Sequence, residues 1–140
     1  MLILVLDTNI YLAAMGSRSF CYDLLLLIAD RPLEYQIFVS DVIMTEIKKG
    51  ADKLLTEKII NHQDREKIMH LIEKVTNINF PEERLRVITE DPDDDAILEC
   101  AVAAQAHLIV TMDHHVLRLK NFRTIAIVQP KTFFYMLSKE

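Results

Sequence analysis

The chain opens on the stretch LILVLDTN at residues 2–9, in which an uninterrupted apolar run ends in a carboxylate. Five consecutive large apolar residues, Leu2–Leu6, are typical of a strand that is buried on both faces. Asp7 follows the last of them, and Thr8–Ala14 are expected to turn into a short helix. A buried strand that passes directly into a helix favours an α/β fold.

Strand and helix patterns alternate along the rest of the chain. Further strands are expected at Ile37–Val39, Ile78–Phe80, Val87–Thr89, Leu108–Thr111 and Thr124–Val128. Further helices are expected at Phe20–Ala29, from Ser40 or Asp41 to Lys49, at Asp52–Ile60, at Asp64–Val75, from Pro92 to Gln105 and from Pro130 to Leu137. Ser19 is expected to cap the helix at Phe20, and Gly50 to end the helix at Lys49. The alternation predicts a parallel sheet that is covered by helices on both faces.

Length and composition predict one globular domain, residues 1–140. The net charge of −5 argues against a broad basic surface for nucleic acid. It does not exclude a nucleic-acid enzyme, because bound cations would offset several acids. Cys21 and Cys100 lie in apolar helical stretches, which predicts reduced core residues of a cytoplasmic protein. Met1–Leu6 is too short for a signal peptide, and Leu24–Ala29 is too short to span a membrane.

Acidic residues follow the apolar runs at positions that would meet at one edge of the sheet. Asp7 ends the first strand, and Asp113 follows the run Leu108–Val110. Glu46 lies about two helical turns beyond the second strand, and acids crowd residues 90–95. Ligands of open α/β sheets bind beyond the carboxyl ends of the strands. Because carboxylates repel each other there unless a hard cation lies between them, the pattern predicts a Mg²⁺ or Mn²⁺ site that acts on phosphate.

Each acidic motif also has a purely structural interpretation. Asp7 could cap a helix, Glu46 could be a solvated helix residue, and the acids at 90–95 could favour the start of the next helix. A phosphatase with an aspartyl nucleophile fits less well, because it needs a second acid where Asn9 stands. A phospho-acceptor receiver domain would use Lys131 after the last strand, but the order of the acids does not suit it.

Helical periodicity distinguishes two neighbouring acids in this cluster, Asp94 and Asp95. The stripe that would face the sheet consists of Ile97, Ala101 and Ala104. Asp94 lies three residues before Ile97 and falls on the same face, whereas Asp95 is turned away by about 100°. This favours Asp94 as the direct metal ligand and Asp95 as a capping or outer group. The spacing back from Asp113 also suits Asp95, so both stay candidates.

Two histidines, His114 and His115, directly follow Asp113. Imidazole is a common metal ligand, so either histidine is a candidate. Adjacent residues on a helix point in different directions, however, and the alternative interpretation is a capped helix that starts at His114.

Taken together, four motifs resemble the PIN domain. They are LDTN at 6–9, SDVIMTEI at 40–47, DPDDDAILECA at 91–101 and LIVTMD at 108–113. The resemblance spans nearly the whole chain and depends on the order and spacing of the motifs rather than on any one of them. The chain looks most like the prokaryotic PIN ribonucleases, which include VapC-like toxins of toxin–antitoxin systems.

The resemblance implies a three-layer α/β/α sandwich with a mainly parallel central sheet and a metal-dependent endoribonuclease that uses Mg²⁺ or Mn²⁺. The family's acidic quartet matches Asp7, Glu46, Asp94 (or Asp95) and Asp113. Two positions depart from the family pattern: Met112 stands where glycine or a polar residue is frequent, and His115 stands where a further acid often lies. The expected products carry 5′-phosphate and 3′-hydroxyl ends.

The expected partners are a single-stranded or structured RNA and an antitoxin protein. The cations that could contact the RNA backbone, or simply be solvated, are Arg84, Arg86, Arg118, Lys120 and Arg123. The stretch Leu24–Ile28 is apolar all round, which predicts a homodimer or a complex with an antitoxin. The alternative function is a non-catalytic interaction module with the same fold.

Overall fold

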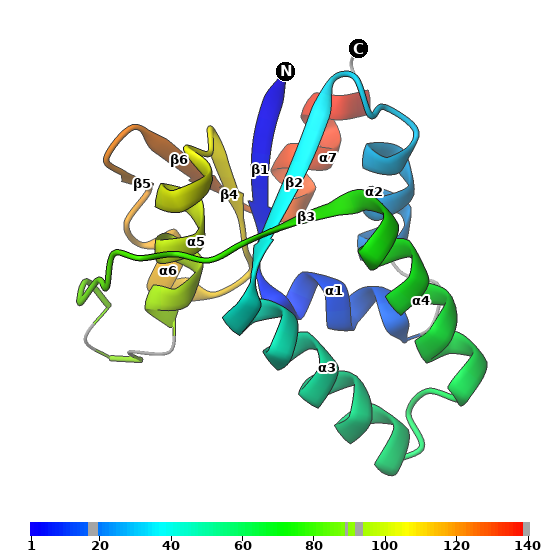
Figure 1. The fold of residues 1–140 in the computed structure, drawn as a ribbon. Coiled ribbons are helices and arrows are strands. Elements are labelled where there is room, and N and C mark those ends of the chain that lie inside the picture. Colours follow the sequence, from blue (N-terminus) through cyan, green and yellow to red (C-terminus); the bar gives the residue numbers. More distant parts are fainter. Residues whose placement is uncertain (17–19, 89, 92–93, 139–140) are drawn as a thin grey trace.

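A single six-stranded sheet forms the centre of the computed structural model, which describes residues 1–16, 20–88, 90–91 and 94–138 (Figure 1). Its strands are β1 (Leu2–Leu6), β2 (Tyr35–Ser40), β3 (Thr76–Asn79), β4 (Leu108–Val110), β5 (Asn121–Phe122) and β6 (Ile125–Val128). They lie in the order β3-β2-β1-β4-β6-β5. All neighbours pair in parallel except β5 and β6, which are antiparallel. The predicted mainly parallel sheet is confirmed.

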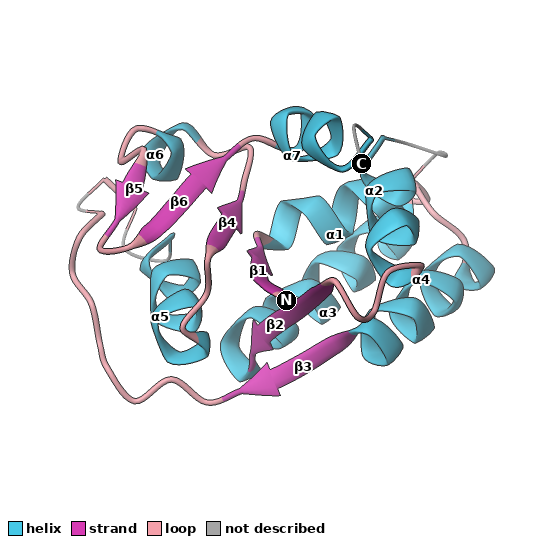
Figure 2. Ribbon diagram, turned by 90° about the horizontal axis from the view of Figure 1, so that it is seen from above, coloured by secondary structure: helices cyan, strands magenta, loops and turns pink. Residues whose placement is uncertain are grey.

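Helices cover both faces of this sheet. They are α1 (Thr8–Met15), α2 (Phe20–Ala29), α3 (Asp41–Thr56), α4 (His62–Val75), α5 (Asp95–Ala104), α6 (His114–Leu117) and α7 (Pro130–Ser138). Seen from above, α5 lies on one face and α1, α2 and α7 lie on the other (Figure 2). Helices α3 and α4 extend away from the carboxyl end of β2 and the start of β3 (Figure 1). This arrangement is the expected α/β/α sandwich.

The core is one cluster of apolar side chains from the sheet and its flanking helices. Leu4, Val5 and Leu6 of β1 are fully buried, because β1 lies in the middle of the sheet and has helices over both faces. The same holds for Ile109 and Val110 of β4. The continuous apolar runs therefore correspond to strands buried on both faces.

The prediction that Gly50 ends a helix is wrong. Helix α3 continues through Gly50 to Thr56, and the separate helix predicted at Asp52–Ile60 does not form. A Cβ atom at Gly50 would lie 2.5 Å from Cδ1 of Leu12. The glycine therefore lets the side chain of Leu12 lie directly against the backbone of α3, and it does not form a left-handed cap.

Several predicted strand boundaries also differ from the structure. Strand β3 occupies Thr76–Asn79 rather than Ile78–Phe80, and residues 87–88 lie in a loop, while Thr89 is outside the described residues. Strand β5 was not predicted, because two residues are too short to show an alternating pattern. The expected cap Ser19 and the expected helix start Pro92 lie outside the described residues; α5 is described from Asp95.

The apolar helix α2 is largely covered within the molecule. Leu24, Leu25 and Ile28 are buried, and Leu26 and Leu27 are half-buried. This stretch therefore offers less uncovered apolar surface than its sequence led us to expect. No single helix of the described residues is long and apolar enough to cross a membrane. Helices α1 and α2 have the required length and composition only when they are counted as one segment, and their axes differ by 107°.

Candidate metal centre

The centre lies where the strand order reverses. From β1 the sheet extends to β2 and β3 on one side and to β4, β6 and β5 on the other. The connections that leave β1 and β4 thus diverge at the carboxyl ends of these strands, which is where open α/β sheets bind their ligands. Asp7 directly follows β1, and Asp113 follows β4 after Thr111 and Met112.

Four of the predicted acids line one small pocket at this point. The pocket has a volume of about 150 Å³. Its lining residues are Asp7, Thr8, Asn9, Ile43, Glu46, Asp94, Ala96, Ile97 and Asp113. Among these described residues there is no lysine or arginine, so the carboxylates have no basic side chain in the pocket wall to balance them.

Asp7 is held on both of its carboxylate oxygens. Its Oδ1 accepts a hydrogen bond of 2.8 Å from the backbone N–H of Thr8. Its Oδ2 accepts one of 2.7 Å from the hydroxyl of Thr111. The Thr111 hydroxyl also accepts a bond of 3.0 Å from the backbone N–H of Asp113. The fully buried Thr111 therefore connects two of the acids.

Sequence analysis did not identify the role of Thr111. The only available signal was a polar residue at the end of a buried apolar strand. Its two partners come from β1 and from the turn after β4, and the contact with Asp7 spans 104 positions in sequence.

Glu46 reaches the pocket from the second turn of α3. Ser40 caps that helix by accepting a hydrogen bond of 3.1 Å from the backbone N–H of Ile43, which fixes where the helix begins. The hydroxyl of Thr8 donates a bond of 3.0 Å to Oε2 of Glu46. The start of α1 therefore orients both Asp7 and Glu46.

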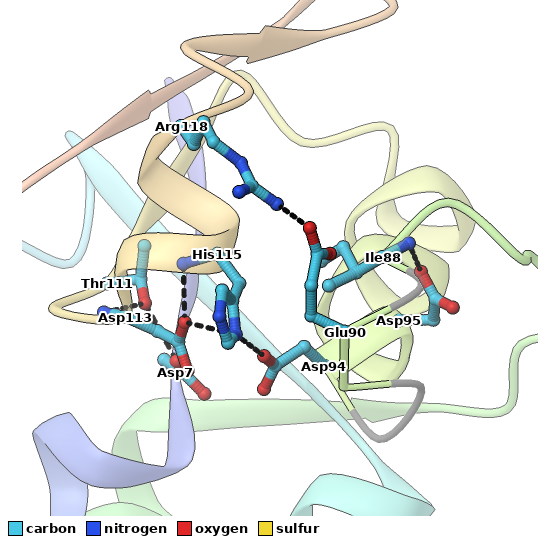
Figure 3. A network of polar contacts seen from close by, with 9 residues as sticks. All are labelled: Asp7, Ile88, Glu90, Asp94, Asp95, Thr111, Asp113, His115 and Arg118. Carbon is cyan, nitrogen blue, oxygen red and sulfur yellow. Dashed lines mark hydrogen bonds and ion pairs between the residues drawn. The ribbon is translucent and has the colours of Figure 1, made fainter.

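Asp94 and Asp95 have different surroundings (Figure 3). Asp94 is the N-terminal cap residue of α5, but its side chain makes no capping hydrogen bond and lines the pocket instead. Asp95 is buried outside the pocket, where its Oδ1 accepts bonds of 3.1 and 3.0 Å from the backbone N–H groups of Val87 and Ile88. Asp95 thus ties α5 to the preceding loop.

The crowding of carboxylates changes their proton affinity. Burial, and then the negative charges of Asp113, Asp91 and Asp7, raise the pKa of Asp94 to about 7. Burial also raises the pKa of Asp7, although the hydrogen bond from Thr111 opposes this effect. Burial is the larger cause of both shifts, and the like charges of neighbouring acids act in the same direction.

Neither histidine is among the residues that line the pocket. His115 is half-buried and adjoins two of the acids, whereas His114 is exposed. Nδ1 of His115 lies 3.7 Å from Oδ2 of Asp94 and 3.8 Å from Oδ1 of Asp113. The backbone N–H of His115 also donates a capping bond of 2.8 Å to Oδ1 of Asp113, so α6 starts at His114, as in the alternative interpretation of the two histidines.

Three of the five predicted RNA-contacting cations pair with acids in the structure. Arg118 pairs with Glu90 (Figure 3), and Arg123 pairs with Glu83. Arg84 lies 3.6 Å from Glu99. The other two, Arg86 and Lys120, are exposed.

Comparisons with known proteins agree with this geometry. A family model described as the PIN domain matches residues 3–115. In the crystal structure of VapBC2 from Rickettsia felis bound to a DNA fragment from their promoter, one chain has the same fold with a TM-score of 0.63. The two chains are 16% identical, and the superposition covers 91% of this chain and 98% of that chain. None of the curated proteins matches. Since the family model covers well over half of the sequence, the chain belongs to the PIN domain family.

Proposed function

We propose that this chain is an endoribonuclease that depends on Mg²⁺ or Mn²⁺ and hydrolyses phosphodiester bonds of RNA. One observation carries the proposal: Asp7, Glu46, Asp94 and Asp113 converge on a single pocket without a basic residue among its described lining. Oδ2 of Asp94 is buried there and has no hydrogen-bond partner. An uncompensated carboxylate oxygen of this kind is costly unless a cation contacts it.

The acidic residues of the pocket would have different roles in holding such a cation. Asp7 and Asp94 would supply carboxylate oxygens directly, and Glu46 and Asp113 would either do the same or hold its water ligands. Thr111 and Thr8 keep Asp7 and Glu46 in place through the hydrogen bonds described above. When bound, a divalent cation supplies polarisation of the scissile phosphate and a more acidic water molecule. Asp95 is left out of this set, because its Oδ1 is committed to two backbone N–H groups.

The substrate would be single-stranded or structured RNA, cut to leave 5′-phosphate and 3′-hydroxyl ends. Water adds to phosphorus, the bond from phosphorus to the 3′ oxygen breaks, and that oxygen leaves with a proton. All five of the predicted cations are exposed, and we propose that Arg86 and Lys120 contact the RNA backbone, since the other three pair with acids.

The physiological role proposed is that of the toxin in a toxin–antitoxin pair. The family membership supports it, as does the shared fold with a chain of the VapBC2 complex. The chain would then bind an antitoxin and form a homodimer or a hetero-oligomer with it. Light scattering of the purified chain, alone and after co-expression with the product of the neighbouring reading frame, distinguishes these assemblies.

Cleavage of single-stranded RNA by wild type, Asp7→Asn and Asp113→Asn tests the catalytic proposal. Both substitutions keep shape and remove charge, so cleavage in Mg²⁺ or Mn²⁺ should vanish while circular dichroism stays unchanged. Asp30→Asn is the matched control, because Asp30 is exposed and lies in the connection before β2. Full cleavage by either site variant would remove that residue from the site. A wild-type chain that binds the cation but cuts no RNA would support the alternative of a non-catalytic interaction module.

A further inference from the structure

We propose that His115 is a direct ligand of the cation in this pocket and that its imidazole makes the site prefer Mn²⁺ to Mg²⁺. This inference rests on the proposed function, since it concerns the same metal site. His115 would add a nitrogen ligand to a set of carboxylates, and this ligand would determine which cation the site prefers.

The backbone directs His115 toward the acids. Asp113 caps α6, and His115 is the second residue of that helix. Side chains on a helix tilt toward its N-terminus, so the imidazole of His115 points back toward Asp113. The capping bond from the His115 N–H to Oδ1 of Asp113 fixes these two residues relative to each other. Figure 3 shows the ring between Asp113 and Asp94.

The distances suit a shared cation better than a direct hydrogen bond. Nδ1 of His115 is 3.7 and 3.8 Å from the nearest oxygens of Asp94 and Asp113, which is too long for hydrogen bonding. One ligand atom from each of the three residues lies within 4.8 Å of the others. A cation that binds at roughly 2.1–2.2 Å holds its ligands about 3 to 4.4 Å apart, so only small side-chain rotations are needed.

One of these oxygens independently points to a missing partner. Oδ2 of Asp94, the atom nearest His115 Nδ1, is buried and makes no hydrogen bond. A cation between Asp94, Asp113 and His115 would contact this oxygen. His115 itself is 42% exposed, so the ring has room to adjust and is not fixed by core packing.

Ligand chemistry then determines which cation is favoured. Mg²⁺ requires oxygen ligands and keeps most of its water, whereas Mn²⁺ and the later transition metals also accept imidazole nitrogen. Replacing one oxygen ligand by His115 therefore weakens the site for Mg²⁺ relative to Mn²⁺.

Isothermal titration calorimetry of the whole chain with Mn²⁺ and with Mg²⁺ tests this inference. His115→Ala should raise the Kd for Mn²⁺ by at least about tenfold and leave that for Mg²⁺ within about threefold. His114→Ala is the matched control and should change neither, because His114 is exposed and does not belong to the cluster of ligand atoms formed by Asp94, Asp113 and His115. His115→Asp, which puts an oxygen ligand in place of the nitrogen, should reduce the preference for Mn²⁺ over Mg²⁺.

A second measurement reports on the ring itself. With Cd²⁺ as a diamagnetic probe, the Nδ1 resonance of His115 should shift strongly on binding in the ¹⁵N spectrum, and that of His114 should not. Wild-type Mn²⁺ affinity in His115→Ala, or an unshifted His115 ring in the Cd²⁺-bound protein, would overturn the inference and leave the nuclease proposal intact. Conversely, a chain that shows the His115 effects but cuts no RNA would overturn only the nuclease proposal. A wild type that binds neither Mn²⁺ nor Mg²⁺ would overturn both.

Discussion

Asp94→Asn should stabilise the metal-free protein, although it removes a residue of the proposed metal centre. The substitution keeps the shape of the side chain and deletes its charge. In the wild type, burial of Asp94 and then the negative charges of Asp113, Asp91 and Asp7 disfavour its charged form. The amide carries no charge, so it avoids both the desolvation of a charge and the repulsion.

The size of the effect follows from the raised pKa of Asp94. A pKa displaced from 3.8 to about 7 corresponds to at most about 4 kcal/mol of unfolding free energy. The side chain is 16% exposed, and solvent screening of the surrounding charges reduces the expected value to about 1–2 kcal/mol. In a domain of this length, that is a rise in Tm of about 3–8 °C.

The difference in stability between Asp94→Asn and the wild type should depend on pH. Because the folded-state pKa of Asp94 is raised, its contribution to wild-type stability is fully present below pH 4 and is lost as the pH rises through 7. The advantage of Asp94→Asn should therefore be largest at pH 8 and disappear near pH 4. Saturating Mn²⁺ at pH 8 should reverse the order, since only the wild type gains from binding.

Differential scanning calorimetry in a chelating buffer and then with Mn²⁺ measures these values, with Asp30→Asn as the charge control. A variant that is less stable than wild type at pH 8 without metal would refute the reasoning. So would an advantage of equal size at pH 4 and pH 8.

Three further outcomes follow from the site. Millimolar Mg²⁺ or Mn²⁺ should raise the Tm of the wild type and raise that of Asp7→Asn much less; an equal rise would mean that the cation binds elsewhere. Asp94→Asn should lose nearly all RNA cleavage, while Asp95→Asn should keep a measurable part. Asp95→Ala should lower the free energy of unfolding in urea by about 1–3 kcal/mol, because two buried N–H groups lose their acceptor. A dead Asp95→Asn beside an active Asp94→Asn would contradict the assignment of the two acids. Thr111→Val should weaken Mn²⁺ binding by about tenfold in calorimetry by releasing Asp7, and an unchanged affinity would show that Asp7 holds its position without the hydroxyl.

The sheet could be predicted from sequence where its strands are buried on both faces. Leu2–Leu6 matches the observed β1, and the run Leu108–Val110 matches β4, because burial on both faces leaves a continuous apolar run. The end of α3 could not be predicted, since Gly50 looks like a local stop signal. In the structure its backbone lies against the side chain of Leu12, which lies 38 positions earlier.

The convergence of the acids on one site could be predicted from the sequence, because parallel strands end at a common edge of the sheet. A rotation of about 100° per residue favoured Asp94 over Asp95 without excluding Asp95, and Asp94 is the one of the two that lines the pocket. The supporting contacts could not be foreseen. Thr111 bonds to Asp7 across the sheet, and Asp95 holds the backbone at 87–88, where a strand had been predicted. Such contacts depend on three-dimensional neighbours that no local pattern encodes.

The glycine in α3 has a consequence for the helix contact beside the metal pocket. Gly50 lies one helical turn after Glu46, and Leu12 lies one turn after Thr8. The pair Thr8 and Glu46 and the pair Leu12 and Gly50 are therefore consecutive parts of the same contact between α1 and α3. The second pair carries no catalytic group, but it places the Leu12 side chain directly against the backbone of α3. A methyl group added at position 50 would first displace the end of the Leu12 side chain, one helical turn from the bond between Thr8 and Glu46. The helix contact that orients Glu46 thus continues through a position with no side chain.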